Sequence, residues 1–106
     1  MNLDLSSNVI QIINLLFKEF FNLFPSTYSI IKYQDNLDDA KKSWVKAFIK
    51  EGLLTHDEVV FICIIKRAVE KLYSLDQPFM PSCGQFINIC FDCKKELEND
   101  FNNPTM

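Results

Sequence analysis

The chain has 106 residues and a mass of 12.4 kDa, a size that fits one small domain with one modest core. Hydrophobic residues make up 48% and charged residues 24%, which is typical of a folded globular protein. Two glycines and one histidine exclude a glycine-rich phosphate loop or dinucleotide fingerprint and leave little material for acid–base or triad chemistry. The composition therefore favours a binding module over an enzyme.

The net charge is −3, from 11 Lys and Arg residues against 14 Asp and Glu residues. Nucleic-acid-binding domains usually carry a basic excess, so we do not expect strong autonomous DNA binding. The N-terminus lacks the basic segment of a signal peptide, and no apolar stretch is long enough to span a membrane. We therefore expect a cytoplasmic protein with reduced cysteines and no membrane contact.

The first predicted helix covers residues 7–24 and is apolar around most of its circumference. A helix this apolar either lies at the centre of a bundle or is partly covered by a partner. We take Phe17 and Phe21 as candidate partner contacts, because surplus apolar surface often marks an interface. This first helix has one narrow polar stripe, formed by Gln11, Asn14, Lys18 and Asn22. The stretch 26–35, which follows the helix, is compatible with a helical turn or with an extended segment.

The second predicted helix covers residues 36–51 and has a core face that contains Trp44 and Phe48. Gly52 stands where a left-handed residue commonly ends a helix. The same helix carries a basic ribbon, which is either a solvated face with Asp38 paired to Lys42 or a contact for an acidic partner or single-stranded DNA. The ribbon consists of Lys41, Lys42, Lys46 and Lys50.

The third predicted helix follows a capping box at residues 55–58, in which Thr55 is the N-cap and Leu54 packs on Val59, and it extends to about residue 74. A rigid connector with two prolines occupies residues 77–81, and a second capping box begins a fourth helix at residues 82–85. The sequence thus predicts an all-α bundle of about four helices with one Pro-rich connector. We expect residues 1–98 to form one domain and residues 99–106 a flexible tail.

Cys90 and Cys93 form a Cys-x-x-Cys pattern in the fourth predicted helix. Together with Cys83 and His56 they have the right number of ligands for a tetrahedral zinc site, and a redox pair is a further alternative. However, the two cysteines share the helix face of Phe86, where a free cysteine packs as a small hydrophobe. We therefore expect no metal and no cofactor.

Two longer motifs stand out in the chain. The first is Trp-Val-Lys-Ala-Phe at residues 44–48 followed by Gly52, and the second is Pro-Phe-Met-Pro-Ser-Cys-Gly-Gln-Phe at residues 78–86. In their order and spacing they resemble the replication protein P family of phage helicase loaders. The similarity runs from about residue 9 to about residue 96. We expect the motif residues to be mostly architectural: Trp44, Phe48, Gly52, Pro78, Phe79, Pro81, Ser82, Gly84, Gln85 and Phe86.

The resemblance implies a replication initiation factor that binds a replicative helicase, an origin initiator protein, or both, without hydrolysing ATP. Family members continue beyond the matching region, in a part associated with gripping the helicase, and Cys83 stands where the family has proline. Two alternatives stay open: a helical DNA-binding regulator that uses the basic ribbon, and a generic protein-interaction module. A weak contact with single-stranded DNA is compatible with the helicase-loader interpretation.

Overall fold

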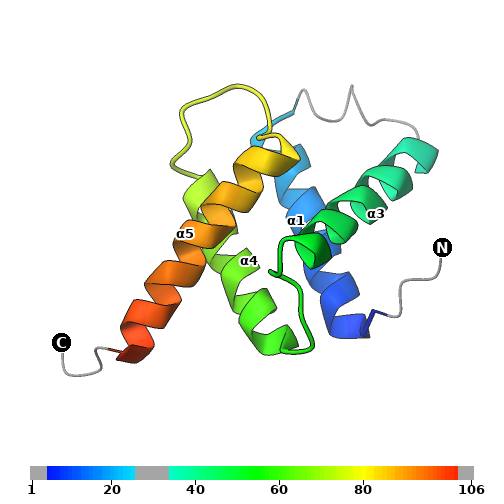
Figure 1. The fold of residues 1–106 in the computed structure, drawn as a ribbon. Helices are drawn as coiled ribbons and strands as arrows, with labels where there is room; N and C mark the ends of the chain where they lie inside the picture. The colour runs from blue at the N-terminus through cyan, green and yellow to red at the C-terminus, as the bar shows by residue number, and fades with distance from the viewer. Residues whose placement is uncertain (1–4, 26–33, 103–106) are drawn as a thin grey trace.

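The structure is a computed structural model that describes residues 5–25 and 34–102. These residues form four helices, and the predicted all-α class is confirmed. The stretch for which the sequence left a helical turn or an extended segment open lies mostly outside the described residues. The helices are α1 (Ser7–Leu23), α3 (Gln34–Lys50), α4 (Glu58–Leu72) and α5 (Cys83–Asn102), labelled in Figure 1.

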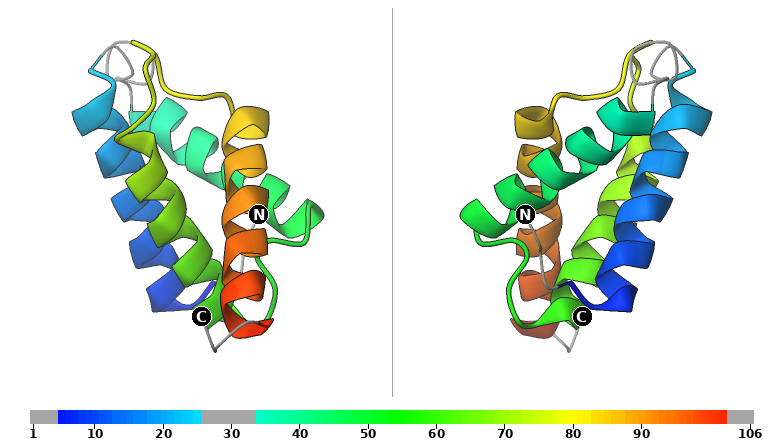
Figure 2. Two further views of the ribbon diagram at one scale, coloured as in Figure 1. Left: turned by 90° about the vertical axis from the view of Figure 1, so that its left-hand side faces the viewer. Right: turned by 90° about the vertical axis from the view of Figure 1, so that its right-hand side faces the viewer.

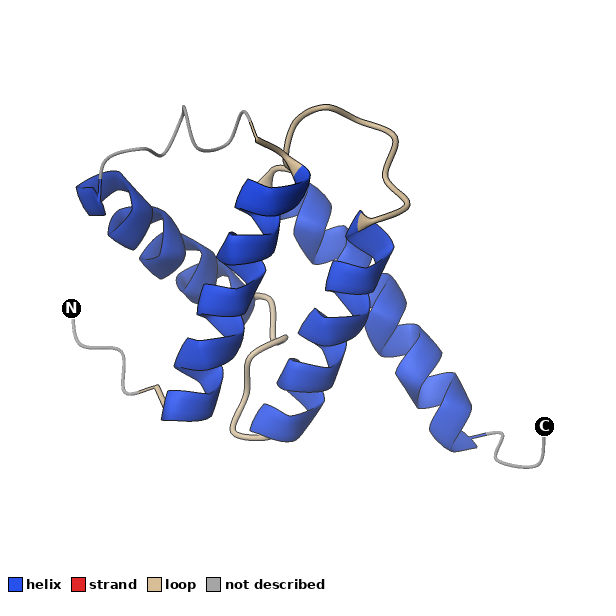
Figure 3. Ribbon diagram, turned by 180° about the vertical axis from the view of Figure 1, so that it is seen from behind, coloured by secondary structure: helices blue, strands red, loops and turns tan. Residues whose placement is uncertain are grey.

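The four helices form two layers. Helices α1 and α4 lie side by side and run in the same direction, as Figure 3 shows from behind. Helix α5 returns antiparallel to α4, and α3 crosses on the same side of the α1–α4 pair as α5, as the two views of Figure 2 show. The face of the α1–α4 pair that points away from α3 and α5 is uncovered by the other described helices.

Two hydrogen bonds join α1 to α4 at opposite ends of the pair. The Ser6 hydroxyl donates to a Glu58 carboxylate oxygen at 2.6 Å, and the Tyr73 hydroxyl donates to a Glu19 carboxylate oxygen at 2.5 Å. Ion pairs on the surface join α4 to α5, where Lys71 contacts Glu96 at 2.6 Å. These polar contacts fix how the helices lie relative to one another, while the packing of their apolar faces supplies most of the stability of the domain.

Trp44 occupies the centre of the core and brings three helices together. Its ring centroid lies 5.2 Å from that of Phe20 on α1, 6.2 Å from that of Phe48 on α3 and 5.6 Å from that of Phe86 on α5. Edge-on and tilted ring pairs at such distances add stability beyond the burial of their area. The two motifs of the sequence therefore meet in one aromatic cluster.

Phe17 belongs to this cluster, which corrects its assignment as a partner contact. Its ring centroid lies 5.6 Å from that of Trp44, and only 1% of the residue is exposed. Most of the apolar surplus that suggested a partner surface is used by the core, because α1 packs against both α3 and α4, while Ile10 and Leu15 stay exposed. Phe17 therefore contributes to packing and not to a surface in the folded domain.

Gly52 ends α3 as predicted, in a left-handed conformation with φ of 76°. The Gly52 N–H donates to the Ile49 carbonyl at 3.1 Å, and the Leu53 N–H donates to the Phe48 carbonyl at 2.9 Å. This pair of bonds is the Schellman arrangement, and it turns the chain so that Leu53 is buried beside the end of its own helix.

The start of α4 differs from the prediction. Asp57, and not Thr55, is the N-cap, because its carboxylate accepts the Val60 N–H at 3.4 Å. The Thr55 hydroxyl instead accepts the Asp57 N–H at 3.2 Å in the preceding turn. Val59 is 70% exposed, so the predicted packing of Leu54 on Val59 is wrong. Glu58 cannot close a capping box with Thr55 because its carboxylate holds Ser6.

The start of α5 agrees with the prediction in part. The Ser82 hydroxyl accepts the Gln85 N–H at 3.1 Å, which is the first bond of the expected capping box. The Gln85 side chain does not complete the box, because it donates to the Gln77 side chain at 3.2 Å. Pro81 is fully buried beneath this corner. Helix α5 then continues to Asn102, four residues into the predicted tail, and residues 103–106 lie outside the described residues.

Candidate partner-binding surface

The outer face of α3 carries a row of exposed lysines, Lys42, Lys46 and Lys50, which we call the lysine row. Successive members are four residues apart, so their Cα atoms rise about 6 Å per step along the helix. In the part of the chain that the structure describes, every ion pair involves Arg67 or Lys71, so the pair of Asp38 with Lys42, offered as one alternative by the sequence, does not form. None of the described acidic residues is thus paired with the three amino groups of the lysine row.

Lys41 does not belong to the lysine row, although the sequence placed it in the same ribbon. It is half-buried, and its amino group donates to the Asn14 side-chain oxygen of α1 at 3.0 Å. One helical position separates it from Lys42, which rotates its side chain by about 100° toward α1. Lys41 therefore links two helices of the domain.

Ile49 lies on the outer face beside Lys46 and Lys50 and is 45% exposed. The sequence analysis missed it, because an isoleucine directly after the core residue Phe48 is easily taken as part of the same buried face. The signal was its offset from Trp44 and Phe48, which places it away from the buried side of the helix. The outer face of α3 thus combines three positive charges with one apolar side chain.

The family-like motifs mainly shape the fold. Trp44, Phe48, Pro81 and Phe86 are buried, while Gly52, Ser82 and Gln85 define helix ends. Phe79 is the exception, because it is 60% exposed on the connector between α4 and α5. Pro78 and Gly84 are also exposed. Phe21, the second predicted contact of α1, is half-buried near the end of that helix.

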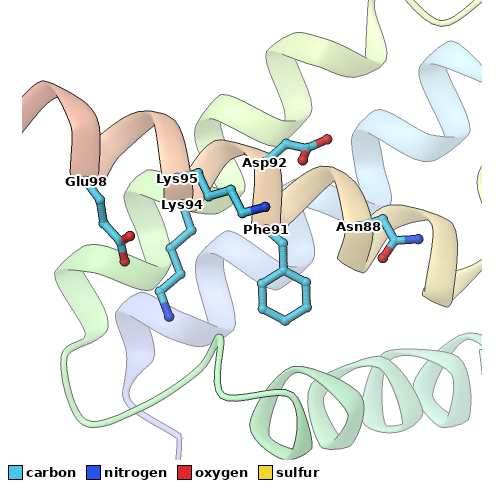
Figure 4. Close-up of a pocket in the computed structure, with 6 residues that line it drawn as sticks. All are labelled: Asn88, Phe91, Asp92, Lys94, Lys95 and Glu98. Atoms are coloured by element: carbon cyan, nitrogen blue, oxygen red, sulfur yellow. The ribbon is translucent and has the colours of Figure 1, made fainter.

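Two shallow hollows lie elsewhere on the surface. One has a volume of about 500 Å³ on α5 and mixes two lysines with two carboxylates around Phe91. In Figure 4 the Phe91 ring and the Lys94 side chain point to the same side of α5, whereas Asp92 points to the other. The other hollow, of about 410 Å³, lies between α1 and α4 and is lined by Leu15, Ile62 and Lys66 among others. The hollow on α5 therefore mixes positive and negative charge, whereas Lys66 is the one charged residue among those that line the hollow between α1 and α4.

The cysteines pack as the hydrophobic interpretation of their pattern suggests. Cys90 and Cys93 are fully buried, and burial raises the pKa of the Cys90 thiol far above its ordinary value. Cys83 is half-buried, and His56 is exposed in the loop before α4. Across residues 5–25 and 34–102, no group of three or more His, Cys, Asp or Glu side chains could hold a metal ion.

Among the described helices, none is both long and apolar enough to cross a membrane. The geometry instead defines a small all-helical domain that offers a charged helix face and a fixed corner for binding.

The sequence profile of the family described as Replication protein P matches residues 11–98, and the chain belongs to this family. A probable helicase loader of Enterobacteria phage phi80 is 33% identical over 82 residues, which cover 77% of this chain and 33% of the relative. The helicase loader of Escherichia phage lambda is 29% identical over 82 residues, which cover 77% of this chain and 32% of that protein. The chain thus matches about a third of the length of these relatives, and no solved structure matches it.

Proposed function

We propose that this chain is a non-enzymatic DNA replication factor that binds a replicative helicase, an origin initiator protein, or both, in the cytoplasm of a phage-infected bacterial cell. The observation that carries the proposal is the family match over residues 11–98, which includes α3, α4 and the connector to α5. The helicase loaders of phages phi80 and lambda, similar over 82 residues each, support it.

The described surface supports action by binding. Its distinctive features are a charged helix face, an exposed connector and two shallow hollows. Both glycines of the chain sit at helix ends, Gly52 after α3 and Gly84 in the first turn of α5. This use of glycine is consistent with a loader that does not cradle a nucleotide.

Within this proposal, the partner contacts include the lysine row and Phe21. A helical DNA-binding regulator is the competing function, and the lysine row is the feature that favours it. The net charge of −3 speaks against it, because a negatively charged domain repels a polyanion.

The test is a fluorescence titration with the purified host helicase and the purified initiator. Cys63 is exposed, so a fluorophore on its thiol reports binding, and Cys83→Ser removes the half-buried competing thiol. We expect saturable binding of at least one of the two proteins, with no ATP turnover by the chain alone. Phe86→Ala provides the control, because it removes a ring at the centre of the core and should abolish binding together with folding.

Binding of neither protein, or ATP hydrolysis by the purified chain, contradicts the proposed function. Tight, salt-dependent binding of duplex DNA in the absence of both proteins would establish the regulator instead.

A further inference from the structure

We infer that the outer face of α3, made by the lysine row together with Ile49, is the docking surface for an acidic amphipathic helix of a partner protein. The inference rests on the proposed function, since it takes the partner to be a protein of the replication complex. It adds the location of the contact and the chemistry of the segment that fits there.

The charge distribution of the chain singles out this face. Residues 40–50 contain four lysines and no acidic residue, which leaves only seven of the eleven Lys and Arg residues to balance all fourteen acids elsewhere. A concentrated positive face on an otherwise negative domain orients an acidic partner toward one surface as it approaches. The same negative remainder repels that partner from other faces.

The spacing of the lysine row fits a helix better than an extended peptide. Its three amino groups follow one another at one per helical turn, about 6 Å apart. A partner helix with glutamates at positions i, i+4 and i+8 presents carboxylates at the same interval. An extended strand, with side chains on one face about 6.5–7 Å apart, falls out of register over the three contacts.

Ile49 provides the apolar part of the contact. Its side chain is 45% exposed, and helical periodicity places it at the edge of the lysine row, on the side of the buried Val45. A leucine or similar residue of the partner can cover it while its acidic residues reach the lysines alongside. Protein interfaces commonly combine an apolar contact with charged residues around its rim.

A protein helix fits the face better than single-stranded nucleic acid. Sites for single strands combine positive charge with exposed aromatic rings for base stacking. Among the described residues, the aromatic side chains nearest the lysine row in sequence are Trp44 and Phe48, which are both buried, and the exposed Tyr73 and Phe79 lie at the end of α4 and on the connector. The single arginine, the residue best suited to phosphate, is engaged with Glu96 and Asp100 across α4 and α5.

The first experiment titrates the whole chain, labelled at Cys63, with a synthetic 18-residue helix that bears glutamates four residues apart beside a leucine ridge. The matched control is the same peptide with glutamine in place of each glutamate, and oligo(dT) is the nucleic-acid probe. We expect the acidic peptide alone to bind, with nuclear magnetic resonance shifts confined to residues 42–50. The triple variant K42Q/K46Q/K50Q should weaken binding at least about tenfold, since rim charges set much of such an affinity.

Matched variants separate local contact from net charge. Ile49→Ser should weaken the acidic peptide about threefold or more, in the range of a small exposed apolar contact, and should leave any oligo(dT) binding unchanged. The variant K94Q/K95Q/K66Q removes the same number of charges from α5 and α4 and should keep peptide affinity within about twofold, because screening suppresses distant charges.

The inference is overturned if the two triple variants lose affinity for the acidic peptide equally, or if the acidic peptide does not bind the chain at all. Binding of oligo(dT) at residues 42–50 that outcompetes the peptide, or a stable dimer of the chain that covers α3, also overturns it. If the helicase or initiator binds wild type and K42Q/K46Q/K50Q equally, the docking surface is wrong while the proposed function stands. If the peptide binds at α3 but neither replication protein does, the proposed function fails instead.

Discussion

The two glycines have different backbone requirements. Gly52 adopts a left-handed conformation with φ of 76°, whereas Gly84 lies in the first turn of α5 without a positive φ. No atom lies within 4 Å of a Cβ built at either position, so crowding is the same at both sites. A comparison of alanine substitutions at Gly52 and Gly84 therefore separates the effect of backbone strain on stability from the effect of steric crowding.

Gly52→Ala should destabilise the domain by about 1 kcal/mol, since the left-handed region disfavours residues with a Cβ. Gly84→Ala should leave stability unchanged or raise it by up to about 1 kcal/mol, because alanine reduces the entropy of the unfolded chain in a helix-compatible site. Urea unfolding followed by circular dichroism measures both. Equal effects of the two substitutions would show that Gly52 does not hold the helix end.

Cys83 is the first residue of α5, where the family resemblance places a proline. Cys83→Pro should be neutral or should raise the free energy of unfolding by up to about 1 kcal/mol, because the first N–H of a helix has no partner within the helix and proline restricts the unfolded chain. Thermal unfolding of the variant beside Cys83→Ala, which also lacks the thiol, checks this. A melting temperature clearly below that of Cys83→Ala contradicts this position for the helix start.

At the scale of elements, the start of α4 depends on Asp57. Asp57→Ala should cost about 1 kcal/mol, the usual value of an N-cap side chain. Thr55→Ala should cost less than about half of that, because its hydroxyl only accepts a bond in the preceding turn. The free energies of unfolding in urea decide between the two; a larger loss at Thr55 would restore the cap expected from the sequence.

The helix ends show where sequence patterns suffice. Gly52 and Ser82 were predicted correctly because each end is determined by a few neighbouring residues and by glycine or serine chemistry. The cap at Thr55 was wrong because Glu58 has a distant competitor, the Ser6 hydroxyl, 52 residues away. A local pattern cannot weigh a partner that only the tertiary fold supplies.

The candidate site was only partly predictable for a related reason. Lys42, Lys46 and Lys50 share a face by helical periodicity alone, whereas the position of Lys41 depends on where α1 lies. Phe17 could not be distinguished from a surface residue, since an almost wholly apolar helix does not reveal which of its faces is covered. Its burial follows from the packing of α1 against α3 and α4, including its contact with Trp44, which the sequence of α1 does not contain.

At the scale of the whole molecule, stability should fall at alkaline pH. Burial raises the pKa of Cys90 above its ordinary value of 9.0, and it also raises the pKa values of Cys83 and Cys93. Hydrogen bonds to carboxylates raise the pKa of Lys71, through Glu96, and that of Tyr73, through Glu19. Above pH 9 the unfolded chain thus binds fewer protons than the folded one, so the unfolding free energy decreases as pH rises, by about 1.4 kcal/mol per pH unit for one fully shifted group.

Urea midpoints at pH 8 and pH 10 test this expectation. Cys90→Ala should show a smaller difference between the two midpoints, because the group with the largest buried fraction is gone. Cys63→Ala, which removes an exposed thiol, should keep the full difference. A midpoint that is higher at pH 10 than at pH 8 would reverse the sign of the argument.

The parallel pairing of α1 with α4 affects how the chain folds as it is synthesised. The first hydrogen-bonded partner of α1 on α4, Glu58, follows Ser6 by 52 residues. At ribosomal rates of about 5–20 residues per second, this interval lasts about 3–10 s, and during it α3 is the one described helix that can cover part of the apolar side of α1. The side of α1 that packs on α4 is therefore open to chaperones at the ribosome during that time, and the core is complete only after α5 supplies Phe86.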